Sequence, residues 1–261
     1  MIIISWSAGV TSAVAGKLAI DKYGKENVRV IYFKIDSAHE DNERFLKECE
    51  AWYGVEIEVL QGKYKDQFEV IEKTKYVNGA NGARCTLELK KKLRFEFEKN
   101  NEVTHTVLGF EFEPKEVNRA IRFKEQYPEA SPVFPLIDYK ITKNEAAFML
   151  KKAGIELPEM YKLGYPNNNC IGCVKGGQGY WNKIRVDFPA HFDRMANLER
   201  KVGATCLKTD VSRIYLDELN PKSGRGMKVV MPDCGSFCDL EFTDIIDDRV
   251  EKVMKGQTEM E

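Results

Sequence analysis

Two short segments combine residue types that can do chemistry, and the first is Ser7-Ala8-Gly9-Val10-Thr11-Ser12. It follows an apolar run and precedes a stretch of helical composition. Its small residues leave backbone N–H groups and three hydroxyls at a helix N-terminus, where the dipole favours an anion. The segment therefore predicts a phosphate-binding loop, with an ordinary capped turn as the alternative. It lacks the residues of G-x-x-x-x-G-K-[ST] and of G-x-G-x-x-G, so it is neither of those nucleotide loops.

The second segment is Cys170-Ile171-Gly172-Cys173, a turn that can present two thiolates on one side. This geometry suits zinc or an iron–sulfur cluster. The chain has seven cysteines, at positions 49, 85, 170, 173, 206, 234 and 238. An intracellular chain of this size rarely depends on disulfides, which favours metal binding or thiol chemistry. Cys49 falls on an apolar helix face and is expected in the core, whereas Cys206 has no partner in the sequence pattern and receives no role.

Strands and helices alternate in the first half. Apolar runs predict strands at 2–5, 28–35, 55–60 and 103–110, and helical patterns fall at 13–23, 39–53 and 86–98. This order implies a doubly wound, mostly parallel α/β sheet. Ligands of such sheets bind beyond the carboxyl ends of the strands, which directs attention to the loop at 7–12, Asp36, Arg84-Cys85 and residues 109–119.

The second half is mainly helical, with helices expected at 143–153, 158–163, 179–187 and 190–201. We therefore expect a nucleotide-binding α/β domain at 1–134, a C-terminal helical, cysteine-bearing region packed on it at 135–248, and a tail at 249–261.

The composition fits one large domain, or a core domain with an appendage: 261 residues, 43% hydrophobic, with a formal net charge of -1. No apolar run approaches the length of a membrane helix and no signal-peptide pattern begins the chain, so we expect a cytoplasmic protein without a membrane partner. A nucleic-acid partner is not favoured, because it would need a local basic patch. The run Lys90-Lys91-Lys92 with Arg94 could form one, but a solvated helix face is the favoured reading.

The loop at 7–12 resembles the pyrophosphate loop, S-G-G-x-[DT]-S, of the PP-loop or adenine nucleotide alpha hydrolase-like superfamily. Within it, the chain most resembles the phosphoadenosine phosphosulfate (PAPS) reductase family, particularly divergent members in phages and bacteria. The similarity extends over about residues 1–240 and includes Asp36 with His39-Glu40, Arg84-Cys85-Thr86 with Leu89-Lys90, Leu108-Gly109-Phe110 with Glu116 and Arg119, and Asn169-Cys170-Ile171-Gly172-Cys173. There are two departures: Ala8 replaces the usual first glycine, and Thr11 stands where ATP-cleaving members usually carry Asp.

The resemblance implies a nucleotide site around this loop. Residues Ser7, Ala8, Gly9, Val10, Thr11 and Ser12 would hold the phosphates, and the strand ends near Trp6 and Asp36 would frame the adenosine. Further candidates, mainly for positive charge, are Arg84, Lys90, Gly109, Glu116 and Arg119. Glu116 and Arg119 can equally form a local surface pair.

The resemblance also implies a metal site. Adenylylsulfate reductases place a Cys-Cys pair and a Cys-x-x-Cys pair around a [4Fe-4S] cluster, and this chain has Ala83-Arg84-Cys85 in place of the first pair. Cys85, Cys170 and Cys173 would then be ligands, with the fourth from Cys238 or Cys234, or with an open iron. Structural zinc and plain buried thiols are the alternatives.

Asp233-Cys234-Gly235 resembles the Glu-Cys-Gly of the nucleophile in sulfonucleotide reductases. Cys234 and Cys238 are therefore candidates for attacking and resolving thiols, although they could also be metal ligands or inert.

The first functional hypothesis is a sulfonucleotide reductase that binds PAPS or adenylylsulfate (APS), passes the sulfonate to a cysteine thiol and draws electrons from a thioredoxin-like donor. A second is an ATP pyrophosphatase that uses Mg²⁺ and adenylylates an acceptor such as a nucleic-acid base. A third is a non-catalytic sensor of a nucleotide or an iron–sulfur cluster.

Overall fold

The computed structural model describes residues 1–79, 82–208 and 212–232. Its centre is a five-stranded sheet in the order β3-β2-β1-β6-β7, in which every neighbouring pair is parallel. The strands are β1 (Ile2–Trp6), β2 (Val28–Phe33), β3 (Ile57–Leu60), β6 (His105–Leu108) and β7 (Pro132–Val133). The predicted doubly wound α/β sheet is confirmed.

The strands form where branched apolar residues run without interruption. In β1, Ile4 lies opposite Val30 of β2 on one side and Val107 of β6 on the other, and all three are buried. Such runs are typical of parallel strands covered on both faces. The sequence predicted four strands and missed the fifth, β7. This strand has only two residues, one of them proline, and therefore shows no periodicity.

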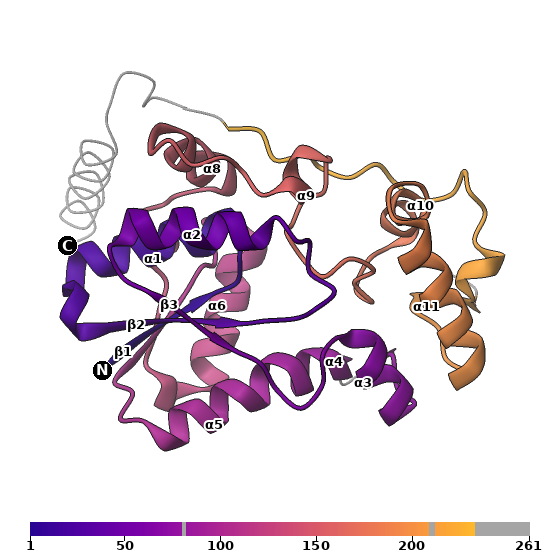
Figure 1. Ribbon diagram of the computed structural model, residues 1–261, viewed down its shortest axis with the longest axis horizontal. Coiled ribbons are helices and arrows are strands. Elements are labelled where there is room, and N and C mark those ends of the chain that lie inside the picture. The colour runs from indigo at the N-terminus through magenta and orange to yellow at the C-terminus, as the bar shows by residue number, and fades with distance from the viewer. Residues whose placement is uncertain (80–81, 209–211, 233–261) are drawn as a thin grey trace.

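Helices cover both faces of the sheet. Figure 1 shows α1 (Val10–Tyr23) and α2 (Asn42–Tyr53) on one side, with α8 (Lys143–Lys152) lying over α1, and α5 (Lys92–Asn100) on the other. A short helix α4 (Arg84–Thr86) continues into α5 through a π-helical turn, Leu87–Lys91. The sequence patterns did not indicate α3 (Gln67–Thr74) or α6 (Pro114–Gln126).

The remaining helices are short or C-terminal. They are α7 (Pro135–Asp138), α9 (Glu159–Lys162), α10 (Gln178–Asp187) and α11 (Pro189–Val202), with 3-10 turns at Lys25–Asn27, Pro128–Ala130 and Leu216–Glu218. Figure 1 shows α10 and α11 together at one end of the molecule, with α3 beside α11. Two small antiparallel pairs complete the fold: β4 (Asn78–Gly79) with β5 (Gly82–Ala83), and β8 (Leu207–Lys208) with β9 (Arg213–Ile214).

The buried side chains form two main clusters. The first lies between the sheet and α1, α2 and α8, and includes Trp6, Phe45 and Met149. The second joins the C-terminal helices to α3, and includes Trp181 and Phe68. The division of the chain near residue 134 remains a prediction. No helix within the described residues has both the length and the apolar character needed to cross a membrane.

Candidate nucleotide site and cysteine loop

The loop between β1 and α1 lies at the carboxyl edge of the sheet, and its backbone conformation shows that one departure from the motif, Ala8, carries a cost. Ala8 has φ of 58°, in the left-handed region where glycine is the usual residue. An alanine methyl group there costs about 1 kcal/mol. Ala8 is also completely buried, so the packing around it holds the residue in this conformation.

Ser12 organises this loop from its centre. Its Oγ accepts hydrogen bonds from the backbone N of Ser7 at 3.1 Å and of Gly9 at 3.3 Å, and donates to the Gly9 carbonyl at 2.9 Å. The Ser7 hydroxyl also donates to it. Ser12 is buried, whereas Ser7 is exposed and Thr11 is half-buried. One serine therefore sets the loop geometry, while the hydroxyls of Ser7 and Thr11 remain within reach of a ligand.

Gly109, which follows β6, packs directly against the same loop. A Cβ at this position would stand 2.6 Å from Ser12 Cα and 2.7 Å from Ser12 N. β1 and β6 are neighbours whose following helices diverge, which makes this the switch point of the sheet. The absence of a side chain at Gly109 is what allows the two loops to meet there.

Two residues from the second half of the chain hold the loop from outside. The Tyr161 hydroxyl accepts a hydrogen bond from the backbone N of Val10 at 3.4 Å, and burial raises the pKa of Tyr161 to about 12. Asn168 is buried, and its Nδ2 donates to the Ala8 carbonyl and to Asn42 Oδ1, both at 2.6 Å. Sequence analysis missed both residues; the only signal was the run of three asparagines, 167–169, before Cys170.

Replacing Tyr161 with phenylalanine should lower stability by about 1 kcal/mol and weaken AMP binding several-fold. The ring would still fill its place, but the Val10 N–H at the first turn of α1 would lose its partner. Thermal denaturation and calorimetric titration with AMP measure the two effects. Tyr165→Phe is the matched control, because Tyr165 donates to Asp187 within the second cluster. Equal losses of AMP affinity in both variants would contradict the role of Tyr161.

The residues expected around the adenosine lie at the ends of β1 and β2. The Trp6 side chain is buried, stacked on Phe45 and edge-on to Tyr32, so only its backbone can face a base. Asp36 is exposed just beyond β2, and its Oδ1 accepts from Gln61 Nε2 at 2.7 Å. Asp36 thus stands at the same edge of the sheet as the loop.

Two of the three expected basic residues, Arg84 and Arg119, already have acidic neighbours, whereas Lys90 is exposed. Arg84 pairs with Glu88 at 2.8 Å, and Arg119 pairs with Glu116 at 3.0 Å while lying over the Phe110 ring. Exposed pairs such as Arg119 with Glu116 contribute at most about 1 kcal/mol, so Arg119 can turn to a ligand at little cost. The Glu88 side chain is nearly buried, so Arg84 is held more firmly.

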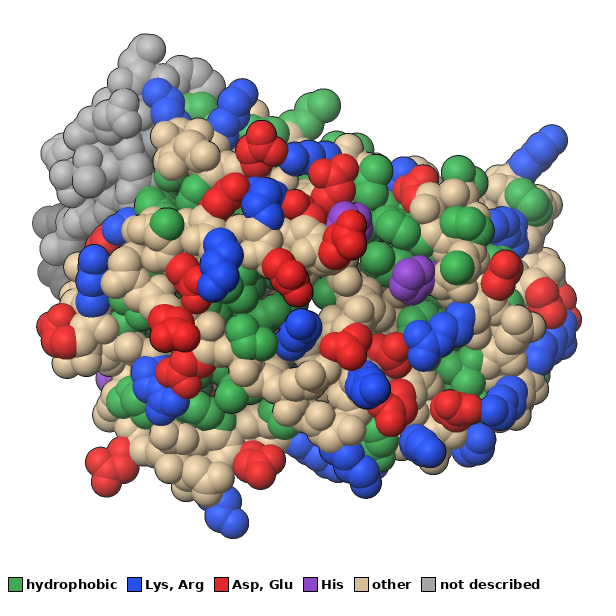
Figure 2. Space-filling view, in the orientation of Figure 1, with side chains coloured by type: hydrophobic (Ala, Val, Ile, Leu, Met, Phe, Trp, Pro, Cys, Tyr) green, Lys and Arg blue, Asp and Glu red, His purple; other side chains and the backbone are tan. Residues whose placement is uncertain are grey.

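The basic run at 90–94 does not form a free patch. Arg94 is buried over the rings of Phe123 and Tyr127, Lys92 pairs with Glu88, and Lys91 donates to the Tyr127 hydroxyl. On the face in Figure 2, basic and acidic side chains of the described residues are interspersed. This arrangement does not favour a nucleic-acid surface on that face.

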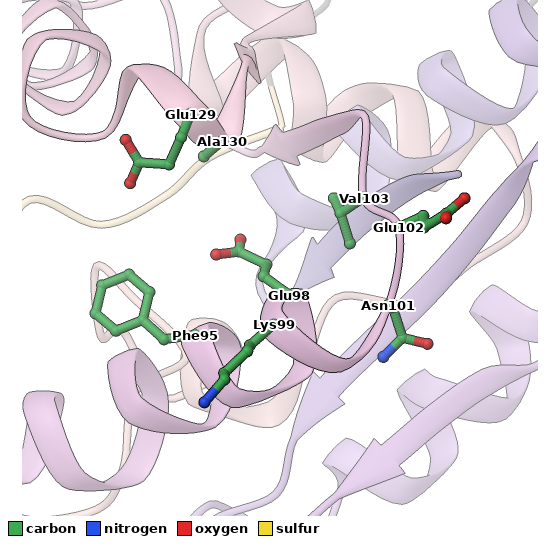
Figure 3. A pocket seen from close by; sticks show the side chains of 8 residues that line it. All are labelled: Phe95, Glu98, Lys99, Asn101, Glu102, Val103, Glu129 and Ala130. Atoms are coloured by element: carbon green, nitrogen blue, oxygen red, sulfur yellow. The ribbon is translucent and has the colours of Figure 1, made fainter.

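The pocket in Figure 3 lies away from the loop, where α5 ends and β6 begins. Three of its lining residues are acidic, Glu98, Glu102 and Glu129, against one lysine, Lys99. It is at the amino edge of the sheet, opposite the 7–12 loop, and its carboxylates would repel phosphate. The acidic lining therefore makes this pocket unsuitable for the phosphates of a nucleotide.

The cysteine loop, residues 170–173, is fastened to the carboxyl edge of the sheet. The Ile171 N donates to the Ser37 carbonyl at 2.8 Å, and Gln67 Nε2 donates to the Ile171 carbonyl at 2.8 Å. Across the loop, the Tyr180 hydroxyl accepts from Cys173 N and donates to the Cys170 carbonyl. Asn168 lies two residues before Cys170 and donates a hydrogen bond to the Ala8 carbonyl. The segment that leads into the cysteine loop therefore also holds the 7–12 loop.

Cys85 lies close to this loop. Burial, followed by the neighbouring thiols of Cys173 and Cys170, raises the pKa of Cys85 to about 11, and burial also raises the pKa of Cys170. All three thiols are free. Within the described ranges, no group of three or more His, Cys, Asp or Glu side chains is arranged to hold a metal ion. Cys234 and Cys238, the expected catalytic thiols and further ligand, lie outside the described residues.

The other two described cysteines differ from each other. Cys49 is completely buried in the first cluster, as expected, and burial raises its pKa to about 12. Cys206 is buried in the second cluster, and burial raises its pKa. Sequence analysis assigned Cys206 no role because no motif links it to the other cysteines.

The fold defines an α/β protein in which the 7–12 loop lies at the switch point of a parallel sheet. The family model described as "Phosphoadenosine phosphosulfate reductase domain" matches residues 1–176, and the chain belongs to this family. The match covers the sheet, the 7–12 loop and the cysteine loop, and confirms the resemblance. A comparison with curated proteins finds no match.

Proposed function

We propose that the chain is a sulfonucleotide reductase, which binds PAPS or APS at the 7–12 loop and transfers the sulfonate to a cysteine thiol. The observation that carries this proposal is the shared anchor at Asn168. Its side chain holds the Ala8 carbonyl in the phosphate loop, and the cysteine loop begins two residues later. This contact supports a site in which thiol chemistry and phosphate binding share one edge of the sheet.

The reaction needs one nucleophilic thiolate and one resolving thiol. The thiolate attacks the sulfate sulfur, an S–S bond forms, and the S–O bond to the nucleotide breaks to release AMP or its 3'-phosphate. A second thiol then attacks the cysteine sulfur, so that sulfite leaves and a disulfide remains. A thioredoxin-like dithiol reduces that disulfide and becomes oxidised in turn.

We assign the nucleophile to Cys234 and the resolving thiol to Cys238. Burial raises the pKa of Cys85 and of Cys170, so in the metal-free chain both stay protonated at neutral pH and are poor nucleophiles. The Asp233-Cys234-Gly235 motif supports the assignment. Loop amides and the hydroxyls of Ser7 and Thr11 would carry the phosphates.

The first test is an anaerobic thermal-shift panel with APS, PAPS, AMP, and ATP plus Mg²⁺. A ligand at 100 times its Kd stabilises the native state by about 2.7 kcal/mol. We expect a sulfonucleotide to stabilise most. Stabilisation by ATP with Mg²⁺ alone would replace the proposal with an ATP pyrophosphatase, which Thr11 in place of Asp disfavours.

The second test is sulfite release from the selected sulfonucleotide, with a dithiol donor. Cys234→Ser should abolish release while keeping nucleotide binding, and Cys49→Ala is the control because Cys49 is a core residue of α2. Unimpaired release by the Cys234 variant would contradict the nucleophile assignment. Tight binding without any turnover by the unaltered chain would make it a nucleotide sensor.

A further inference from the structure

We propose that four exposed cations beside α10 form a surface that binds the phosphodiester backbone of a nucleic acid. The four are Lys175, Lys222, Arg225 and Lys228, and we call them the basic surface. None of them belongs to the 7–12 loop. The inference therefore goes beyond the proposed function and does not rest on it.

Two glycine-rich segments meet to build this surface. The first, residues 174–179, leads from the cysteine loop into α10, and the second, residues 219–228, follows β9 and a 3-10 turn. Asn182 of α10 ties the segments together, because its Nδ2 donates to the carbonyls of Asn220 at 2.9 Å and Ser223 at 2.8 Å. Figure 1 shows the second segment passing α10 on its way toward α9 and α8.

Glycines allow the two segments to touch through their backbones. A Cβ at Gly179 would overlap the carbonyl oxygen of Arg225, and a Cβ at Gly224 would overlap the backbone N of Gly179. Gly224 also has φ of 99°, a conformation that glycine adopts without strain. Arg225 is thereby fixed against the first turn of α10, and Lys175 lies three residues before that helix begins.

The positive charge of this surface is not neutralised by the fold. Among the described residues, none of the four cations forms an ion pair with a carboxylate, whereas the neighbouring Lys183 pairs with Asp187 at 2.8 Å. The sequence has no acidic residue at 160–186 or at 219–232. The first turn of α10 also has none, so the positive end of its helix dipole adds to the charge of the side chains.

The residue types favour a phosphate backbone over an acidic protein. The core of a protein interface is built on aromatic and apolar side chains. Within the described parts of 174–179 and 219–228, no large hydrophobic side chain is exposed. These segments instead offer Lys and Arg side chains, and exposed backbone at Gly177 and Gly226, where a Cβ would meet no atom within 4 Å. Lysine, arginine, backbone N–H groups and helix N-termini are the groups that hold nucleic-acid phosphates.

The basic surface supplies the local patch that a chain with a net charge of -1 needs in order to bind a nucleic acid. It is separate from the run at 90–94, whose charges are engaged within the fold. Neither 174–179 nor 219–228 contains an aromatic residue on which a base could stack. We therefore expect binding to the backbone without sequence preference and with a strong dependence on salt.

The test measures fluorescence anisotropy of labelled duplexes of about 20 base pairs, one DNA and one RNA, with the full chain at about 50–200 mM salt. Four phosphate contacts predict a slope of about 3–4 for log Kd against log salt on DNA. Replacing Lys222, Arg225 and Lys228 together with alanine should weaken binding about tenfold or more at the lowest salt and lower the slope by about 2–3. Tighter binding of one duplex identifies which nucleic acid supplies the phosphates.

The matched control replaces Lys115, Arg122 and Lys124 with alanine. These side chains are exposed on α6, so the control removes the same charge from another part of the chain. It should keep the affinity and the salt slope of the unaltered chain. Equal weakening in both triple variants would overturn the proposal, and so would a polyglutamate peptide of about 20 residues that binds as tightly as the duplexes.

A second measurement needs no variant. The duplex should protect Lys175, Lys222 and Lys228 of the unaltered chain from acetylation while leaving Lys115 reactive, and equal acetylation with and without the duplex would overturn the assignment. Thermal shifts with APS and PAPS test the proposed function separately. They should be the same in the variant of the basic surface as in the unaltered chain, because they report on the 7–12 loop; a loss of these shifts in a folded variant would assign the cations to the nucleotide site instead.

Discussion

Gly109→Ala should weaken binding of APS or PAPS by about tenfold or more and lower stability by about 1–3 kcal/mol. The new methyl group would meet the backbone of Ser12 at 2.6–2.7 Å, a contact that no side-chain rotation can relieve. Either β6 or the start of α1 must move, and Ser12 is the residue whose hydroxyl shapes the phosphate loop. Isothermal titration and thermal denaturation measure the two losses.

Gly226→Ala is the matched control for this change. A Cβ at Gly226 meets no atom within 4 Å, and its φ is not in the left-handed region. That variant should therefore bind the same nucleotide as tightly as the unaltered chain. If Gly109→Ala also binds normally, the β6 loop does not support the phosphate loop and the nucleotide site must lie elsewhere.

The elements that could be predicted are those whose residue pattern is visible in a contiguous stretch of sequence. The branched apolar runs of β1 and β2, each followed by a helical pattern, define the alternating order that forces a parallel sheet. β7 was not predictable, because two residues show no period and the pairing of Val133 with Val107 in β6 is a tertiary event. α6 was missed for a related reason: it is largely exposed, and Ala120 is its one fully buried residue.

The candidate site likewise has a part that could be predicted from contiguous residues and a part that could not. The phosphate loop is contiguous in sequence, so its small residues and hydroxyls could be read directly. Tyr161 and Asn168 act through contacts with residues far away in the chain, and the run of three asparagines before Cys170 is the only local signal for either of them. These two supports of the loop could therefore be found only in the folded chain.

The Asn168 side chain links the 7–12 loop to the segment before the cysteine loop by donating hydrogen bonds. Its Nδ2 donates to two acceptors, the Ala8 carbonyl and Asn42 Oδ1, while its own Oδ1 is buried without a hydrogen-bond partner. A carboxylate of the same shape would face both acceptors with no proton to donate. An uncompensated buried charge of this kind costs several kcal/mol.

Asn168→Asp should therefore lower stability at pH 8 by about 3 kcal/mol or more and should largely abolish binding of APS or PAPS, since negative charge would adjoin the phosphate loop. Burial beside two oxygen acceptors raises the pKa of the new carboxyl in the folded chain. The folded form then holds its proton more tightly than the unfolded form, so the loss grows as pH rises from about 4 and shrinks on return to pH 5. Urea denaturation at pH 5 and pH 8 measures this difference.

The neighbouring variant Asn169→Asp separates burial from charge. Asn169 is exposed, and the same change there adds the same charge one residue along the chain. It should leave stability within about 0.5 kcal/mol of the unaltered chain at both pH values. If the two variants behave alike, general charge near the loop is responsible, and the contact of Asn168 with Ala8 does not join the two loops. A large, pH-dependent deficit confined to Asn168→Asp would instead mean that the phosphate loop and the cysteine loop depend on one buried amide.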